Sequence, residues 1–401
     1  MNAVERERPP RPVAVLNKAS NRDARRRNLE AALQSVYREG VTSRADIARL
    51  TGLTRATVSD LVSELVRDDL VREAGPGTSS GGKPPTLLTP NPGGRDILAI
   101  DLGRQPFQGA LVDLGGQIHH RLEGSPDAVA GPAATEEVFR LARRLVRSSD
   151  APVLGIGVGT PGIVDPGGSV VEAANLDWHG VPLGQELIDR LGLPVVVAND
   201  AHAAALAEFD PASEANLALV KVGIGVGAGL MVDGRLYGGD RPAAGEIGHI
   251  RVVDDGAPCT CGNTGCLETV VSVPAILRAA RTASKARVPA TRDPLPWDAA
   301  ELAAILGPEA VRTAVERAGH ALGSVLAHLV AILDVHRIVV ALELRGAAED
   351  FLRAAREEVM ARVLPDLATV VELSPAARDA DLVLAGAAAL VLRDRLGVAW
   401  R

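Results

Sequence analysis

The segment CTCGNTGC, residues 259–266, contains all three cysteines of the 401-residue chain, and GEIGH, residues 245–249, lies just upstream. Three cysteines placed at random would fall within eight positions with a probability on the order of 10⁻³, so the cluster needs a cause. Three thiols and one imidazole form a complete tetrahedral zinc set, and the neighbouring glycines suit a tight turn around one ion. We therefore predict one structural Zn²⁺ held by four ligands: His249, Cys259, Cys261 and Cys266. The alternative is a set of unconnected thiols, or one disulfide with a thiol left over.

The composition is that of a globular protein long enough for two or three domains, with 47% hydrophobic and 23% charged residues. Aromatic residues make up only 2%, which argues against stacking platforms for single-stranded nucleic acid. The apolar run 321–333 contains His328 and is shorter than the about 20 residues of a membrane span. The first residues show no apolar export signal, so we expect a cytoplasmic protein without a membrane partner, in which thiolates stay available to zinc.

Charge is divided unevenly along the chain. Residues 1–92 hold 15 Lys and Arg against 11 Asp and Glu, a net charge of +4, whereas residues 93–401 hold 28 against 39, a net charge of −11. A basic head on an acidic body is compatible with a nucleic-acid-binding end joined to a domain of another purpose. Solvated surface charge alone could also produce this asymmetry.

The basic head begins with a segment that we expect to be a disordered tail, because residues 1–20 combine prolines with charges. From residue 21 the apolar positions follow helical spacing until Gly40 ends the run. Ser43 and Asp46 form a start like a capping box for a second helix. After a short turn at residues 51–53, Thr54 is placed to cap a third helix.

Helix, glycine-containing turn and helix predict a helix-turn-helix, and two short strands at 70–73 and 86–89 predict a wing around the loop between them. Hydrogen-bonding side chains near the start of the third helix suit base edges and phosphates. The predicted DNA-binding residues are Arg44, Thr54, Arg55, Thr57, Ser59 and Lys83, the last of them in the wing. The alternative is a small helical domain that binds a protein.

From residue 96 onward, apolar runs typical of strands alternate with amphipathic helices, which predicts an α/β architecture. The expected strands are 97–100, 109–113, 153–158, 195–198, 218–221 and 337–340, and the expected helices include 136–146 and 183–191. Three glycine-rich segments lead from strand to loop: 101–103 follows the first strand, 155–162 closes another, and 223–229 follows a third. Such loops can bring backbone N–H groups close to phosphate, although each by itself is more often a tight turn.

Several motifs together resemble the ROK family, which comprises repressors, open reading frames and kinases. They are GVGTPGIVD at 157–165, NLDW at 175–178, Pro182-Leu183, VANDA at 197–201, GEIGH at 245–249 and CTCGNTGCLE at 259–268. The resemblance runs from about residue 21 to the end of the chain. It implies a winged helix-turn-helix domain at 21–92, followed at 93–401 by a two-lobed α/β domain of the actin-like and hexokinase-like fold.

The resemblance also implies a sugar site. In kinases of the family, the aspartate that matches Asp200 is the general base for the attacking hydroxyl, and the asparagine that matches Asn199 holds another hydroxyl. The implied sugar-binding set is Asn175, Asn199, Asp200, Glu246, His249 and Glu268. Carboxylates and amides at strand ends suit a polyol, which offers many donors and acceptors. Asn199 and Asp200 could instead cap the apolar helix that follows them, and both roles are compatible.

Two stretches depart from the kinase pattern. At the first phosphate loop the chain has Arg104 and Gln105 where family kinases have a glycine and a threonine, and Pro106 lacks an N–H. At 339–343 it has VVALE where family kinases have a glycine pair beside the adenosine. Because phosphoryl transfer depends on every nucleotide contact, we expect that kinase activity is lost.

The sequence therefore predicts a sugar-responsive transcriptional regulator, most simply a repressor, with a sugar pocket and a degenerate ATP site. Its expected partners are a palindromic double-stranded operator, a sugar or sugar phosphate effector, and further copies of the chain in a dimer or a dimer of dimers. One alternative is a working sugar kinase that carries a DNA-binding head. Another is a regulator whose effector is not a sugar.

Overall fold

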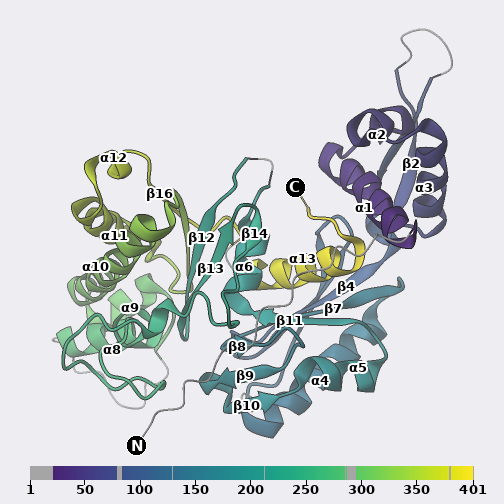
Figure 1. Cartoon of the computed structure of the whole chain (residues 1–401). Coiled ribbons are helices and arrows are strands. Elements are labelled where there is room, and N and C mark those ends of the chain that lie inside the picture. The colour runs from purple at the N-terminus through teal and green to yellow at the C-terminus, as the bar shows by residue number, and fades with distance from the viewer. Residues whose placement is uncertain are drawn as a thin grey trace, which may run out of the picture.

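The computed structural model describes residues 21–78, 84–128, 130–211, 213–284, 286, 295–378 and 381–400. The predicted tail at 1–20 and the predicted wing residue Lys83 lie outside these residues. Within them, a small head and two lobes follow one another along the chain (Figure 1).

The head contains three helices and a three-stranded antiparallel sheet of order β1-β3-β2. Its elements are α1 (Asn21–Glu39), β1 (Thr42–Ser43), α2 (Arg44–Thr51), α3 (Arg55–Arg67), β2 (Val71–Pro76) and β3 (Thr86–Pro90). Ser43 caps α2 by accepting from the Asp46 N–H, and Thr54 caps α3 by accepting from the Thr57 N–H. The helices and strands expected in the head are therefore present. The two caps set the starts of α2 and α3.

The first lobe is built on a five-stranded sheet of order β11-β7-β4-β5-β6, in which β4, β7 and β11 run parallel. Its strands are β4 (Asp96–Asp101), β5 (Gln108–Asp113), β6 (Ile118–Glu123), β7 (Val153–Thr160) and β11 (Val195–Asn199). Helices α4 (Gly131–Ser148) and α5 (Leu183–Leu191) pack on one face of it. The short elements of this lobe are η1 (Pro92–Gly94), β8 (Ile163–Val164), β9 (Val170–Ala173), η2 (Ala174–Leu176) and β10 (Trp178–Val181).

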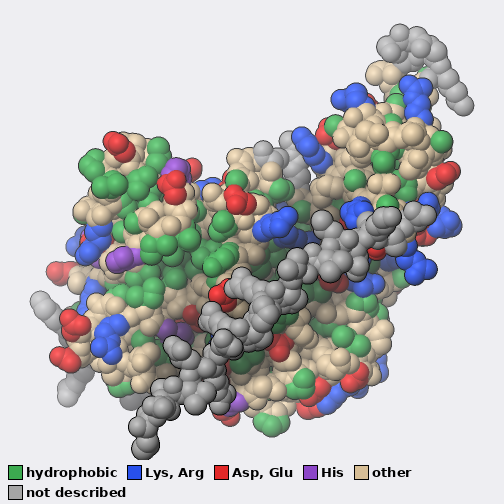
Figure 2. Space-filling view, viewed as in Figure 1, with side chains coloured by type: hydrophobic (Ala, Val, Ile, Leu, Met, Phe, Trp, Pro, Cys, Tyr) green, Lys and Arg blue, Asp and Glu red, His purple; other side chains and the backbone are tan. Residues whose placement is uncertain are grey.

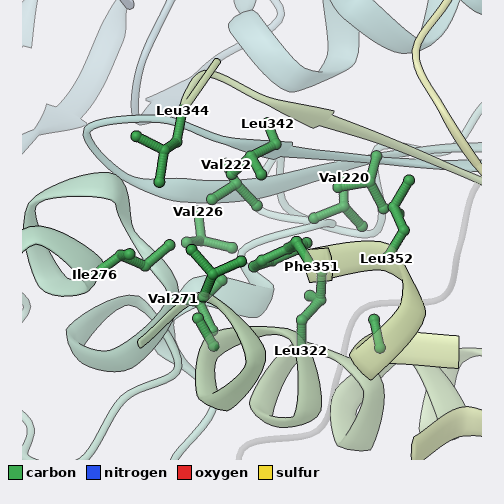
Figure 3. Close-up of a cluster of buried hydrophobic side chains, with 14 of the residues drawn as sticks. Val220, Val222, Val226, Val271, Ile276, Leu322, Leu342, Leu344, Phe351 and Leu352 are labelled. Carbon is green, nitrogen blue, oxygen red and sulfur yellow. The ribbon is translucent and has the colours of Figure 1, made fainter. Parts of the chain in front are cut away.

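The second lobe has a five-stranded sheet of order β14-β13-β12-β15-β16. Its strands are β12 (Leu217–Val222), β13 (Val226–Val232), β14 (Arg235–Leu236), β15 (Arg337–Leu342) and β16 (Glu372–Pro375). Its other elements are η3 (Ile247–His249), α7 (Glu268–Val271), α8 (Val273–Ala283), α9 (Ala299–Leu306), α10 (Pro308–Leu333), α11 (Ala348–Arg362) and α12 (Pro365–Ala368). Figure 3 shows the aliphatic core between this sheet and its helices, where Val220 and Val222 of β12 meet Leu322 and Phe351.

Two helices lie between the sheets, α6 (Asp200–Glu208) and α13 (Leu382–Leu396) (Figure 1). They approach at backbone distance, because a Cβ built at Gly386 of α13 would lie 1.9 Å from the Ala203 carbonyl oxygen of α6. Similarly, a Cβ built at Gly157 of β7 would lie 2.0 Å from the Ala387 carbonyl oxygen of α13. No side chain therefore separates α13 from its neighbours at these points.

Residues 397–400, which follow α13 and are called here the C-terminal tail, reach the head. The Ala399 N–H donates to Gln34 Oε1 of α1 at 2.9 Å, and Gln34 Nε2 donates to the Ala399 carbonyl oxygen at 3.3 Å. Trp400 Nε1 and the Tyr37 hydroxyl both donate to the Leu114 carbonyl oxygen of the first lobe. One hydrophobic cluster also continues from α1 into β4, β5 and α13, so the head is packed onto the first lobe.

The α/β alternation predicted from the sequence is confirmed, and each of the six expected strands lies within an observed one. The helix expected at 136–146 is longer at both ends, and the one expected at 183–191 has those bounds. Across the described ranges, every helix falls short of the length or apolarity needed to cross a bilayer.

Candidate functional site

A pocket lies where the carboxyl ends of β4, β7 and β11 face the loop between β12 and β13. Parallel strands bring their carboxyl ends to one edge of a sheet, which is where open α/β sheets hold ligands. All six residues of the predicted sugar-binding set line this pocket: Asn175, Asn199, Asp200, Glu246, His249 and Glu268. Among the other lining residues are Gly103, Gln105, Gly162, Lys221, Gly225 and Thr260.

Asn199 and Asp200 lie at the junction of β11 and α6 and are both buried. The Asn199 side chain caps α6 by accepting from the N–H groups of Ala201 and His202, and its Nδ2 donates to the Gly162 carbonyl oxygen. Asp200 Oδ1 accepts from the Ala201 N–H at 2.8 Å. The capping role is therefore real, and it fixes both side chains at the pocket wall.

Two further carboxylates approach the pocket from the second lobe. Glu268, at the start of α7, accepts from the Val226 N–H through Oε2 at 3.1 Å, and a Cβ at Gly225 would lie 2.8 Å from that oxygen. Burial raises the pKa of Glu268 and of Glu246 above their usual range. The Val226 N–H opposes the shift at Glu268, and His249 opposes the shift at Glu246. Several acceptors thus face one small space, which is the arrangement that a polyol requires.

The four predicted zinc ligands converge, and their ligand atoms all lie within 4.8 Å of one another. Cys259 Sγ lies 3.6 Å from His249 Nδ1, and Cys261 Sγ lies 3.8 Å from Cys266 Sγ. A tetrahedron with Zn–S bonds of about 2.3 Å and a Zn–N bond of about 2.0 Å has edges of about 3.5 to 3.8 Å. The donor set and its spacing therefore fit Zn²⁺.

His249 connects this cluster with the pocket. Its Nδ1 faces Cys259, while its Nε2 lies 3.7 Å from Glu246 Oε2. The two nitrogens therefore face different partners, as expected for a histidine that serves both a metal and the ligand pocket. Cys266 is buried and Cys261 is exposed, so the cluster spans from the core to the surface.

A cluster of charged side chains beside Asp200 went unnoticed in the sequence. Lys221, at the end of β12, places its Nζ 3.2 Å from Asp200 Oδ2 and 2.9 Å from Glu343 Oε1. Arg104 lies 3.8 Å from Asp101 and 4.0 Å from Glu343. A lysine inside the apolar strand LALVKV was the signal that could have indicated this cluster.

The glycine-rich segment at 223–229, whose last four residues belong to β13, contacts the protein's own groups. A Cβ built at Gly223 would lie 2.5 Å from Glu343 Oε2, and one at Gly229 would lie 2.3 Å from the Ala201 carbonyl oxygen. Gly225 belongs to the wall of the ligand pocket. The prediction that Gly225, Gly227 and Gly229 belong to a phosphate loop stays a prediction.

The predicted DNA-binding residues that are described gather in the head. Thr54, Arg55 and Ser59 are exposed around the start of α3, and Thr57 is half-buried there. Arg44 lies at the start of α2 and pairs with Glu73 of β2 at 3.3 Å. Figure 2 shows Lys and Arg side chains spread over the head on the face in view.

A two-lobed α/β domain with a polar interlobe pocket and a separate helical head defines a class of sugar-kinase-like proteins with an added module. A family model described as "ROK family" matches residues 97–394, and the chain belongs to this family.

Relatives of two kinds resemble the chain. The xylose repressor of Bacillus spizizenii is 29% identical over 92% of this chain and 96% of its own length. The xylose repressor of Caldicellulosiruptor bescii is 32% identical over 82% of this chain and 86% of its own. The glucokinase of Halalkalibacterium halodurans is 31% identical, over 74% of this chain and 95% of its own.

Solved structures divide in the same way. A ROK family transcriptional regulator, a homologue of the Escherichia coli MLC protein, superposes with a TM-score of 0.78 at 26% identity, covering 93% of this chain and 96% of its own. A ROK family glucokinase from Streptomyces griseus, solved with glucose and AMPPNP, has a TM-score of 0.62 at 25% identity, covering 74% and 98%.

Proposed function

We propose that the protein is a sugar-responsive transcriptional repressor. The observation that carries this proposal is that a pocket lined by amide and carboxylate side chains and a helical head with an exposed helix start occur in one packed chain. The xylose repressor of Bacillus spizizenii and the solved ROK family transcriptional regulator each match more than nine-tenths of the chain, and the two glucokinases match about three-quarters.

The head, residues 21–92, acts as a winged helix-turn-helix. Helix α3 enters the major groove with Arg55, Thr57 and Ser59 towards base edges, while Arg44 and Thr54 are placed for phosphates. The sequence predicts that Lys83 belongs to the wing. Because one recognition helix reads too few bases for genomic specificity, the protein works as a homodimer on a palindromic operator, with half-sites about one helical turn apart or a multiple of it.

The effector domain, residues 93–401, binds a sugar between its lobes. Asn175, Asn199, Asp200, Glu246, His249 and Glu268 accept from or donate to its hydroxyls. One Zn²⁺ held by His249, Cys259, Cys261 and Cys266 would fix the segment that carries Glu246 and Glu268. A sugar that contacts both lobes favours their closed arrangement, which moves the attached heads relative to one another in the dimer.

A working kinase is the second candidate, because Asp200 lies in the pocket and glucokinases are among the relatives. Against it, the chain has Arg104 and Gln105 where family kinases have a glycine and a threonine, and VVALE at 339–343 where they have a glycine pair. Phosphoryl transfer is catalysed mainly by positioning and charge, so these changes weigh heavily.

The test begins with selection of bound DNA from a random library by the purified full chain. Affinity for the selected operator is then measured with and without each sugar of a panel. We expect one sugar to change this affinity by roughly 5- to 150-fold. A coupled assay run with the same panel should show no ADP release above the rate without sugar. Sugar-dependent ADP release, or failure to select any DNA, would overturn the proposal.

A further inference from the structure

Lys221 is a buried cation that the proposed function leaves unused. Its side chain is 9% exposed, and its Nζ lies between Asp200 Oδ2 and Glu343 Oε1. Burial alone would lower the pKa of Lys221, but Asp200, Glu343 and Asp101 together raise the pKa above its usual range. The side chain therefore carries its charge, and removing a lysine from water is costly unless such partners hold it.

The ammonium also belongs to the wall of the ligand pocket, beside Asp200. An ammonium has three N–H donors, and the two ion-pair partners of this one, Asp200 and Glu343, are both carboxylates. A sugar hydroxyl is both donor and acceptor. One hydroxyl placed against this pair can donate to Asp200 while its oxygen accepts from Lys221. The pair therefore complements both the donor and the acceptor of a single hydroxyl.

The charge balance of the wall works against an anion at the same place. Asp200, Glu246 and Glu268 line the pocket, and the charge of Lys221 is already shared with Asp200 and Glu343. Arg104 is likewise held by Asp101 and Glu343. A phosphate monoester carries a charge of about −1.5 to −2 at neutral pH. Among the described lining residues it would meet several carboxylates and one lysine that is already ion-paired.

We propose that Lys221 is a specificity-determining residue which, together with Asp200, selects an uncharged sugar with a free hydroxyl at this position and rejects the sugar phosphorylated there. The inference rests on the proposed function, because it names the effector class of the same pocket. Lys221 binds the hydroxyl directly, and Glu343 positions Lys221 and keeps its charge compensated.

The test measures binding to the full chain by isothermal titration calorimetry. The probes are glucose, xylose and N-acetylglucosamine, together with glucose 6-phosphate, xylose 5-phosphate and N-acetylglucosamine 6-phosphate. Wild type should bind one uncharged sugar at least about tenfold more tightly than its phosphate. Lys221→Met should lower the affinity for that sugar by about tenfold or more. Glu343→Gln removes one carboxylate partner of the Lys221 ammonium. This variant should keep most of the sugar affinity, and the difference in affinity between the sugar and its phosphate should become smaller.

The two variants change affinity in different ways, so a general loss of structure cannot produce both results, and thermal unfolding of each variant checks its fold. Tighter binding of a phosphate by wild type would overturn the inference, as would unchanged sugar affinity in a folded Lys221→Met. Failure of wild type to bind any of the six probes would instead overturn the sugar-binding function on which the inference rests.

Discussion

Asn199 and Asp200 each serve the fold and the pocket at once. Asn199 caps α6 with one atom and holds the β7–β8 turn with another, while Asp200 spends one oxygen on the Ala201 N–H and presents the other to Lys221. A substitution at Asn199 would therefore disturb the start of α6 as well as any ligand. Asp200 makes fewer bonds of this kind and is the better position for testing the site.

Asp200→Ala should remove the response to sugar. A hydrogen bond to a charged group contributes about 1.5–3 kcal/mol, which corresponds to a loss of sugar affinity of roughly 10- to 150-fold. Operator binding is titrated at increasing sugar concentration for wild type and variant. The matched control is Asp189→Ala, because Asp189 is an exposed carboxylate of α5 in the same lobe. A variant that still responds at wild-type sugar concentrations would show that the effector binds elsewhere.

Asp101 should make stability depend on pH. Burial, with added repulsion from Asp200 and Glu343, raises the pKa of Asp101 to about 6, although Lys221 opposes the shift. A carboxyl group whose pKa is raised in the folded state binds its proton more tightly there. Its contribution is therefore fully present below the unfolded pKa near 4 and is lost as the pH rises through about 6.

Between pH 7 and pH 5, wild type should gain about 1 kcal/mol of unfolding free energy from this group. Asp101→Asn should lack that gain, since an amide oxygen can still accept from the Gly103 N–H but cannot titrate. Urea unfolding of both proteins at the two pH values measures the difference between their pH dependences. Glu246 and Glu268 are present in both proteins, so their contributions cancel in this difference. Equal pH dependence of the two proteins would contradict the prediction.

Cys261→Ser should lower both metal content and sugar affinity, because the ligand cluster and Glu246 share His249. Loss of one zinc ligand weakens binding of the metal severely, and the segment that carries the pocket glutamates then loses its anchor. Elemental analysis of protein purified without chelator gives the metal content. Thr264→Ser, in the same loop but outside the ligand set, should retain both properties. Zinc-free wild type with normal sugar affinity would refute the prediction.

At the scale of single elements, the caps explain why the head could be predicted. Ser43 and Thr54 bond to N–H groups three residues further on, so the start of each helix is a local property of the sequence. Six strands of the lobes, β4, β5, β7, β11, β12 and β15, could be predicted for a similar reason, since their apolar runs are continuous.

The pocket is a different case, because its members come from separate segments that only the fold brings together. Asn175, Asp200, Glu246 and Glu268 were identified through family resemblance rather than through local pattern. The cluster around Lys221 has no such motif, and it depends on β12 lying beside β15 in the sheet. Distance along the chain therefore hid the partners of Lys221, although the lysine itself was visible in an apolar strand.

Helix α3 provides a test of the head. Arg55→Ala should weaken binding to the selected operator by roughly 5- to 150-fold, since a side chain that reads a base edge contributes about 1–3 kcal/mol of discrimination. Binding to unrelated DNA should change little. Arg67→Ala is the control, because Arg67 ends the same helix and pairs with Asp68. Equal weakening on operator and unrelated DNA would assign Arg55 to phosphates instead.

At the scale of the whole molecule, α13 joins the two functional regions. Leu382 and Val383 at its start lie beside Lys221 and Glu343, and the C-terminal tail at its end is bonded to α1 of the head. A change in the lobes therefore has a continuous path of packed groups to the DNA-binding module.

Substituting both Gln34 and Trp400 by alanine should uncouple these regions. The change removes the bonds of the tail to α1 and to Leu114 and leaves the pocket untouched. Sugar affinity should remain within about twofold of wild type, while the coupling between sugar and operator, about 1–3 kcal/mol in typical cases, should fall by half or more. Sugar titrations with and without operator give both quantities. Undiminished coupling would place the path elsewhere.

The glycine contacts of α13 bear on how far a small movement can travel. Side chains packed between two elements can change rotamer and so absorb a shift of a few tenths of an ångström. At Gly386 and Gly157 no side chain lies between α13 and its neighbours, and main chain contacts main chain. Because the main chains are in direct contact at these points, we expect a displacement of α6 to move α13 by nearly the same amount. Replacing either glycine by a larger residue would block the movement of α13 rather than ease it. A repressor blocked in this way would keep one DNA affinity whatever sugar is present.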